Sequence, residues 1–186
     1  MRIVVTMRDA SLSAYAARLE QVAAGKGRAF LAAALNQAGR GIRAQSVPAE
    51  TAQTGLDHDV IDRAQQTIEA TGGKLSFTIA SKGGNVRLKF FGAEESGNGV
   101  QAHPWNKSTH YARAFTMGGR PGARVPLPFR GEVKVRAGAK RLPLRTLRSG
   151  LFIPDEMLTG RTGSTLDRAS NSLVPPILLA RLGSLL

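Results

Sequence analysis

The sequence predicts an α+β fold in which long N-terminal helices pack on a mostly antiparallel sheet with long loops. Two observations carry this prediction. Residues 27–47 are rich in alanine with apolar residues at helical spacing, and from residue 74 onward the apolar period changes to two. The 186 residues suffice for one domain with a hydrophobic core, and no internal repeat occurs. We therefore expect a single domain over residues 1–186.

The helix expected over residues 27–47 has the most regular pattern in the chain. Apolar residues recur four, three and four positions apart and form one stripe: Leu31, Leu35, Ala38 and Ile42. Polar residues on the opposite face predict that this face is solvated: Asn36, Arg40 and Arg43. Gly39 and Gly41 weaken the helix or mark the close approach of another backbone. Pro48 is expected to end it, because a residue before proline avoids helical geometry.

Three further elements are expected before the β-rich region. Residues 2–8 are β-branched and predict a short edge strand. Residues 12–24 carry apolar residues at helical spacing and predict a first helix. A third helix is expected over residues 60–68, with Asp57 or Asp59 as its N-cap. These helices and the central one form the helical layer of the prediction.

Alternating apolar residues predict two β-hairpins. Residues 75–79 and 86–91 form the first, which should lay its apolar face on the central helix. Residues 132–137 and 141–144 form the second, which is strongly basic. Pro143 cannot donate a hydrogen bond within a sheet, so its strand is expected at an edge.

Two segments rich in glycine and proline predict long loops. Residues 92–108 show no apolar period, and we expect them to be mobile until a partner orders them. Residues 111–117 read as a strand, and residues 118–131 as the second loop. Trp105, the only tryptophan, either anchors a partner subunit, stacks on a nucleic-acid base, or plugs its loop onto the domain.

The C-terminal region predicts a helical turn at residues 155–158 and a short helix at 165–173. Residues 174–176, a valine and two prolines, are expected to break that helix. Residues 177–186 are almost entirely apolar, so they either cap the domain's own core or dock on a neighbouring subunit. The candidate subunit-interface residues in this tail are Ile177, Leu178, Leu179 and Leu182.

Charge is the strongest feature of the composition. The formal net charge is +13 and the pI is about 11.3. Residues 74–150 hold 15 basic and 3 acidic side chains, so this segment accounts for +12 of the total. A concentrated basic segment indicates a polyanionic partner such as nucleic acid. The alternative is that the charge only keeps solvent-exposed loops soluble.

The basic segment contains a candidate nucleic-acid surface. If Val133, Val135 and Leu142 face the core of the second hairpin, the charged residues between them must point outward. Together with cations of the preceding loop they would form one positive surface: Arg120, Arg124, Arg130, Lys134, Arg136, Lys140 and Arg141. Such cations bind phosphates and not base edges, so binding is expected to be independent of sequence.

Patterns that predict catalysis or cofactor binding are missing from the sequence. The chain has no cysteine, and its 3 histidines do not have the spacing of a metal site. No phosphate-binding glycine loop, no nucleophile elbow and no convergent carboxylate pair occurs. We therefore expect neither a catalytic site nor a cofactor or metal. No apolar stretch approaches the length of a membrane span, and no signal peptide is evident, so a cytosolic setting is expected.

The order of segments resembles the phage minor tail protein Z family, also called tail completion proteins. The likeness runs over residues 27–160 and consists of an alanine-rich helix, a hairpin, an Arg113-Ala114-Phe115 unit and a basic strand, followed by Arg141-Leu142-Pro143-Leu144 and then Gly150–Pro154. Residues 161–186 would then be a C-terminal docking tail. The chain differs from the family pattern at residues 48–73, which are near neutral, and at 92–110, which read as an insertion.

The resemblance implies a non-enzymatic virion protein at the head-proximal end of a long tail. It would form a ring, sixfold by resemblance, with other tail and neck proteins, and would help position double-stranded DNA in the channel. Its location would be the virion, with assembly in the bacterial cytoplasm. The alternative is a sequence-nonspecific nucleic-acid-binding protein without a virion role.

Overall fold

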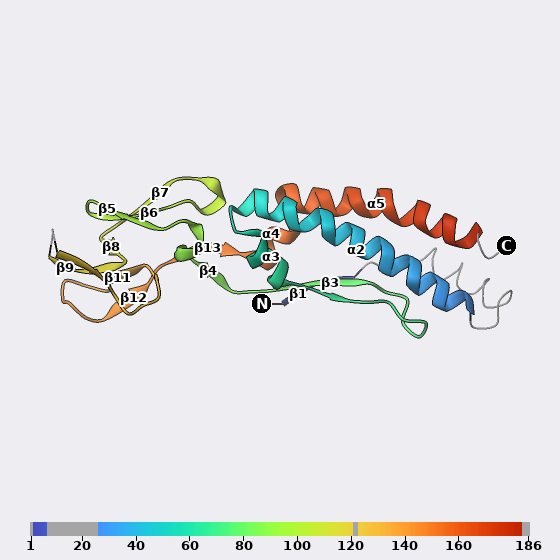
Figure 1. Ribbon diagram of the computed structural model, residues 1–186, viewed down its shortest axis with the longest axis horizontal. Helices are drawn as coiled ribbons and strands as arrows, with labels where there is room; N and C mark the ends of the chain where they lie inside the picture. The colour runs from blue at the N-terminus through green and yellow to red at the C-terminus, as the bar shows by residue number, and fades with distance from the viewer. Residues whose placement is uncertain (1, 7–25, 121–122, 184–186) are drawn as a thin grey trace.

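The computed structural model describes residues 2–6, 26–120 and 123–183, and it shows an elongated α+β molecule (Figure 1). Long helices and one sheet occupy one half, which we call the helical end. Small sheets formed by residues 85–152 occupy the other half, which we call the β-rich end. The predicted fold class is confirmed. The helix predicted over residues 12–24 lies outside the described residues.

Helix α2, Lys26–Thr54, forms the spine of the helical end. The predicted apolar stripe is confirmed, because all four residues are at most 2% exposed: Leu31, Leu35, Ala38 and Ile42. The predicted end at Pro48 is wrong, since the helix continues through it to Thr54. Pro48 lies on the exposed side, while Glu50 and Thr54 in the following turn are fully buried. Burial of that turn offsets the hydrogen bond that proline cannot donate.

The polar face of α2 is only partly solvated, because the Arg40 side chain is 60% exposed whereas Asn36 and Arg43 are half-buried. Asn36 accepts a hydrogen bond from the Ala70 backbone N–H at 2.6 Å and donates to the Ala70 carbonyl at 3.0 Å. Arg40 forms an ion pair with Glu69. Arg43 donates to the backbone carbonyl oxygens of residues 62 and 65 at 2.8 and 3.1 Å. Polar side chains therefore fasten residues 62–70 along this face of the helix.

The sheet of the helical end has the strand order β1-β3-β2 and is antiparallel. Its strands are β1 (Arg2–Thr6), β2 (Gln65–Ile68) and β3 (Thr78–Lys82). The predicted edge position of β1 is confirmed. The helix predicted over 60–68 is shorter: α3 (His58–Ala64) ends where Gln65 turns extended. Gln65 is buried and hydrogen-bonds Ser46 and Glu50 of α2, which holds β2 against the helix.

Gly39 makes close packing between α2 and β3 possible. A methyl group at this position would overlap the ring of Phe77, which is fully buried just before β3. The approaching group is therefore a side chain, and not the backbone that the sequence suggested. On another face of α2, a methyl group at Gly41 would lie 3.1 Å from Leu173. The two glycines allow the sheet and the C-terminal helix to approach the same helix.

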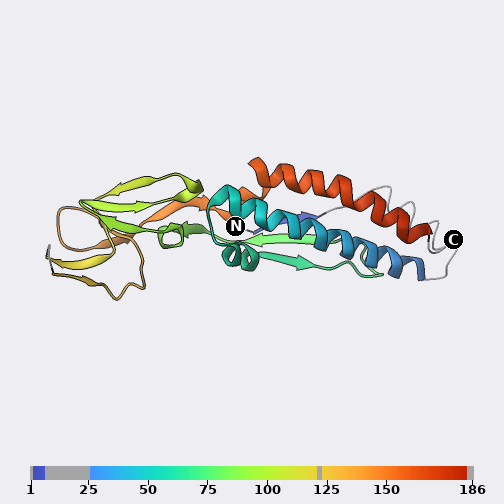
Figure 2. The same cartoon turned by 45° about the horizontal axis from the view of Figure 1, so that its top comes forward.

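The C-terminal region forms α4 (Ile153–Leu158) and α5 (Gly160–Gly183). Helix α5 runs antiparallel to α2 along its length, and α2 lies between α5 and the sheet (Figure 2). The turn predicted at 155–158 is confirmed as α4. The predicted break at 174–176 is wrong, because Pro175 and Pro176 lie inside α5 with their rings exposed. Contacts with α2 on both sides of the prolines explain why the helix continues.

The first predicted hairpin does not form. Strand β3 lies in the sheet of the helical end, whereas β4 (Asn85–Arg87) pairs with β13 (Arg148–Phe152). The predicted strand at 86–91 gives way to a 3₁₀ helix, η1 (Leu88–Phe91). Leu88 and Phe91 are both buried, and a helical turn places residues three apart on one side, whereas a strand would separate them.

Both predicted long loops contain short strands. The first holds β5 (Glu94–Ser96), β6 (Gly99–Ala102) and the 3₁₀ turn η2 (Pro104–Asn106). The predicted strand at 111–117 is divided into β7 (Thr109–Ala112), β8 (Ala114–Phe115) and the start of β9 (Met117–Arg120). Strand β9 pairs with β10 (Ala123–Pro126) inside the second loop. β5, β6 and β7 form one antiparallel sheet.

The predicted basic hairpin is confirmed, with its strands slightly displaced. Strand β11 (Lys134–Arg136) pairs with β12 (Leu144–Thr146) on one side and β8 on the other. The strand order β12-β11-β8 leaves β12 at an edge, as the position of Pro143 predicted. Val133 is buried, but Leu142 is 67% exposed, so the expectation that Leu142 faces the core is wrong. Leu142 lies in the turn before β12, outside the alternating strand pattern.

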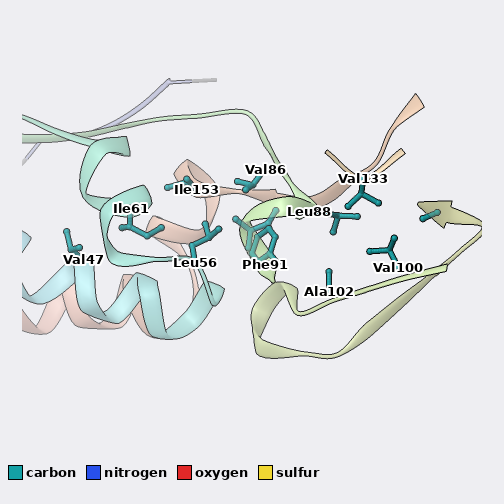
Figure 3. Close-up of a cluster of buried hydrophobic side chains, with 12 residues drawn as sticks. Val47, Leu56, Ile61, Val86, Leu88, Phe91, Val100, Ala102, Val133 and Ile153 are labelled. Atoms are coloured by element: carbon teal, nitrogen blue, oxygen red, sulfur yellow. The ribbon is translucent and has the colours of Figure 1, made fainter. Parts of the chain in front are cut away.

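One hydrophobic cluster spans the junction between the two ends (Figure 3). Val47, Leu56 and Ile61 enter it from the helical end, and Ile153 from α4. The β-rich end supplies most of the remainder: Val86, Leu88, Phe91, Val100, Ala102, Ala114, Val133 and Leu151. Because one core continues through the junction, burial of apolar surface joins the two ends.

Candidate nucleic-acid interface

The positive charge gathers at the β-rich end of the elongated molecule. Residues 85–152 hold 13 Lys and Arg but only 3 Asp and Glu. Those cations belong mainly to the short strands and turns of one end (Figure 1), whereas the helices of the opposite end bear few excess charges. Charge of one sign at one end gives the molecule a strong electrical asymmetry, which attracts polyanions to that end.

Lys134 is not solvated as the sequence predicted. Its ammonium donates to Glu132 at 2.7 Å and to the Thr146 hydroxyl at 2.6 Å, and its side chain is only 15% exposed. It also lies 5.1 Å from the centroid of the Phe129 ring. Residues two apart share a strand face, so Glu132 is placed to hold Lys134 against the sheet. Lys134 therefore stabilises the hairpin and is removed from the candidate interface.

Glu132 is the centre of this ion cluster. It also pairs with Arg87 at 2.5 Å, which ties the basic hairpin to strand β4. The hydrogen bond from Lys134, and then the positive charges of Lys134 and Arg87, hold the pKa of Glu132 below its ordinary value. Two cations of the basic segment are thus partly neutralised within the fold.

Arg124 is also occupied within the chain. It forms an ion pair with Glu95 of β5 and donates to the Met117 carbonyl at 3.0 Å. Glu95 in turn accepts hydrogen bonds from the backbone N–H groups of Thr116 and Met117 at 3.0 and 2.9 Å. This carboxylate joins β5 to β9 and neutralises Arg124, so Arg124 contributes less free charge than the sequence suggested.

The other predicted cations are placed differently. Arg130, Arg136, Lys140 and Arg141 are all exposed at the β-rich end. Arg120 belongs to β9, but its side chain lies outside the described part. The sequence reasoning did not select Arg113 or Arg145, which are also exposed there. Arg113 has a left-handed φ of 60° at the bend between β7 and β8, and no strand period could have revealed that bend.

A groove of about 860 Å³ lies between the hairpins of the β-rich end. The β5–β6 turn, strands β8 and β9 and the β11–β12 turn contribute to its walls. Three exposed arginines line it together with Arg124: Arg113, Arg136 and Arg141. The lining also contains six large apolar residues: Phe115, Met117, Leu127, Phe129, Leu142 and Leu144. The groove is thus both cationic and apolar, whereas the cations around it, such as Lys140 and Arg145, lie on exposed turns and strands.

Trp105 packs inside its own chain. Its ring lies against the junction cluster, and its indole N–H donates to Glu156 of α4 at 2.8 Å. The neighbouring Asn106 donates to the Ala52 carbonyl of α2 at 2.9 Å. These contacts join residues 105 and 106 to α4 and α2 of the same chain, without a partner. Of the alternatives for Trp105, these contacts match the one in which the side chain packs its own loop onto the domain.

The candidate interface residues of the C-terminal tail divide between two environments. Leu178 is half-buried and packs against the cluster of Leu31 and Leu35 on α2. Ile177 is also half-buried, whereas Leu179 is 68% exposed. Leu182 continues the same helix, but its side chain lies outside the described part. The tail therefore caps its own core through Leu178 and leaves Leu179 available to a neighbour.

A buried carboxylate, which sequence reasoning missed, lies beside the junction. Glu50 is fully buried on α2 and accepts a hydrogen bond from Gln65 at 2.6 Å. Its second carboxylate oxygen has no hydrogen-bond partner among the described residues. Burial, with a smaller contribution from the nearby charge of Glu156, raises the pKa of Glu50 to about 7 against the opposing Gln65 hydrogen bond. Its helical neighbours gave no signal, because a glutamate near a helix end is ordinarily exposed.

Within the described residues, no group of three or more His, Asp and Glu side chains is arranged to hold a metal ion. In the same part of the chain, every helix is too short or too polar to cross a lipid bilayer. Comparison of the chain with protein-family models, curated protein sequences and solved structures finds no match.

Proposed function

We propose that the protein is a structural subunit of a phage tail, of the minor tail or tail completion type, whose basic β-rich end lies against DNA. The observation that carries the proposal is the segregation of charge to one end of an elongated molecule. A subunit of this shape can place its near-neutral helices among protein neighbours and its cations toward a polyanion. The resemblance of residues 27–160 to the phage minor tail protein Z family supports the same role.

In this role the subunits form a ring at the head-proximal end of the tail, with six copies by resemblance. Exposed cations outside the groove, repeated around the ring, would line the DNA path: Arg130, Lys140 and Arg145. Turn and strand cations bind phosphate without reading bases, which suits a channel through which any sequence passes. The exposed Leu179 on α5 supplies an apolar contact for a neighbouring subunit. The protein would be assembled in the host cytoplasm and reside in the virion, beside other tail and neck proteins.

The test is duplex DNA binding as a function of salt. Wild-type affinity should fall with salt with a log–log slope of about −0.9 per phosphate neutralised. Reversal of three exposed cations outside the groove should reduce both the affinity and the slope: Arg130→Glu, Lys140→Glu and Arg145→Glu. The matched control reverses three exposed cations at the helical end, Lys74, Arg161 and Arg168, so that the change in net charge is equal.

Equal losses for the two triple variants would show that only net charge matters, and would contradict a DNA-facing β-rich end. The alternative function, a nucleic-acid-binding protein without a virion role, shares the charge distribution and predicts the same DNA titration. Purified phage tails distinguish the two, because only the proposed function places the protein in them.

A further inference from the structure

The groove of the β-rich end has a lining that phosphate binding alone does not require. Six large apolar side chains line it beside Ala114, and two of them are strongly exposed: Leu142 by 67% and Met117 by 41%. Exposed leucine and methionine side chains gain nothing from contact with phosphate. Arginine, methionine and aromatic residues together are typical of surfaces that bind other proteins. The composition of the groove thus indicates a ligand that carries apolar groups.

The charge in the groove is unbalanced. Among its described lining residues, Glu95 is the only carboxylate, and it is taken up by Arg124 and by the backbone of residues 116 and 117. Arg113 and Arg141 have no carboxylate beside them in the lining, and the described partner of Arg136 is the ring of Phe115 at 5.9 Å. A complementary ligand therefore carries negative charge in addition to its apolar groups.

The aromatic residues of the groove argue against a single-stranded nucleic acid. Bases bind proteins by stacking on open aromatic faces. Here Phe115 carries the Arg136 guanidinium, and Phe129 carries the Lys134 ammonium at 5.1 Å. One face of each ring is thus already covered by a cation. The volume of about 860 Å³ is in the range of sites that enclose one small ligand or a short segment, and a duplex could not enter it.

We propose that this groove docks a short segment of a partner protein in which carboxylates alternate with apolar side chains. The carboxylates pair with Arg113, Arg136 and Arg141, and the apolar side chains cover Leu142 and Met117. Alternation suits an extended segment, because its successive side chains point to opposite sides and its carboxylates and apolar groups then form two separate rows. The inference goes beyond the proposed function, since the cations assigned to DNA in its test, Arg130, Lys140 and Arg145, do not line the groove.

The probe is a fluorescein-labelled peptide of alternating aspartate and leucine, with binding measured by anisotropy. Comparison probes are an aspartate–serine peptide, a lysine–leucine peptide and a single-stranded oligothymidylate. We expect the aspartate–leucine peptide to bind at least about tenfold more tightly than each of the others, because only it complements both the arginines and the apolar residues of the lining.

Two double variants separate the apolar from the cationic part of the groove lining. Met117→Ser with Leu142→Ser removes apolar contacts, and Arg113→Gln with Arg141→Gln removes charge. Each pair should weaken the aspartate–leucine peptide by at least about tenfold. The matched controls are Val125→Ser, 56% exposed outside the groove lining, and Arg145→Gln, and both should change affinity less than about twofold. All the substituted side chains are exposed, so the fold should persist, which circular dichroism checks.

Failure of the aspartate–leucine peptide to bind overturns the proposal. Equal binding of oligothymidylate or of the aspartate–serine peptide, unaffected by the serine pair, also overturns it and makes the groove a general polyanion site. The duplex titration of the Arg130, Lys140 and Arg145 variant reads out the proposed function separately, so either idea can fail alone.

Discussion

At the scale of single residues, Glu50 shows how much an unexpected burial can change. A carboxylate without a counter-ion inside a protein favours its protonated form, because the ionised form loses its hydration. Glu50 is completely buried, and the nearby acidic side chain is that of Glu156 on α4. Its hydrogen-bond donor is the neutral amide of Gln65, whose own amide oxygen accepts from the Ser46 hydroxyl, and neither bond requires a charge on Glu50.

The raised pKa of Glu50 predicts a pH dependence of stability. The unfolded chain releases this proton near pH 4.5, whereas the folded state holds it to about pH 7. The stabilisation is therefore complete below pH 4.5, decreases as the pH rises through 7, and is lost above. A pKa unit is worth about 1.4 kcal/mol, so the contribution is roughly 3 kcal/mol.

Glu50→Gln tests this prediction, because glutamine keeps the size and cannot ionise. The free energy of unfolding of wild type relative to Glu50→Gln should decrease by roughly 3 kcal/mol between pH 4.5 and pH 8 in denaturant titrations. Glu94→Gln, on the exposed strand β5, is the control and should keep the wild-type profile. A wild-type to Glu50→Gln difference that stays constant with pH would contradict the burial of a titrating carboxylate.

At the scale of elements, the packing of α2 against β3 depends on the absence of a side chain at Gly39. Glycine costs a helix interior about 1 kcal/mol relative to alanine, so a Gly→Ala change would ordinarily stabilise α2. Here the added methyl group would overlap the ring of Phe77. Overpacking in a core costs about 1–3 kcal/mol and outweighs the gain in helix propensity.

We therefore expect Gly39→Ala to lower the free energy of unfolding by about 1–3 kcal/mol. Combining it with Phe77→Leu, which removes the ring, should cost less than the sum of the two single changes. Gly84→Ala is the control, because no atom lies within 4 Å of its added methyl group. A stabilised Gly39→Ala variant would show that helix propensity decides at this position and would refute the packing argument.

The sequence predicted elements well where local pattern and burial agree. The apolar stripe of α2, the edge strand β1 and the basic hairpin follow from period and from Pro143, and all are present. Prolines were misread at 48, 175 and 176, because their exposed positions and the packing of neighbouring turns are properties of the tertiary structure. The first hairpin was predicted wrongly for a similar reason. Alternation of apolar and polar residues shows that a strand has two faces but does not show which strand it pairs with.

The candidate site could be predicted only in outline. The excess charge is a sequence property, and most of it does lie at one end of the fold. Which cations remain without an ion pair depends on where the carboxylates lie in the fold. Glu95 pairs with Arg124, and Glu132 pairs with Lys134. The groove combines residues from several hairpins, and its Arg113 lies at a bend that no pattern indicates.

At the scale of the whole molecule, the two ends differ in charge but are joined by one hydrophobic cluster. The cluster at the junction includes Leu56 and Ile61 from one end and Leu88 and Val133 from the other. A continuous core holds the basic end at a fixed direction relative to α2 and α5. In a ring of such subunits, the direction of the basic end would be the same in every copy, which is what a uniformly charged channel requires.

The most direct test of the proposed role is a cryo-electron microscopy map of the neck of a phage particle that contains the protein. We expect elongated subunits in a closed ring at the head-proximal end of the tail, with their β-rich ends toward the DNA and α5 against a neighbouring subunit. A ring with the helices toward the lumen and the β-rich ends outward, or purified tails without the protein, would contradict the account.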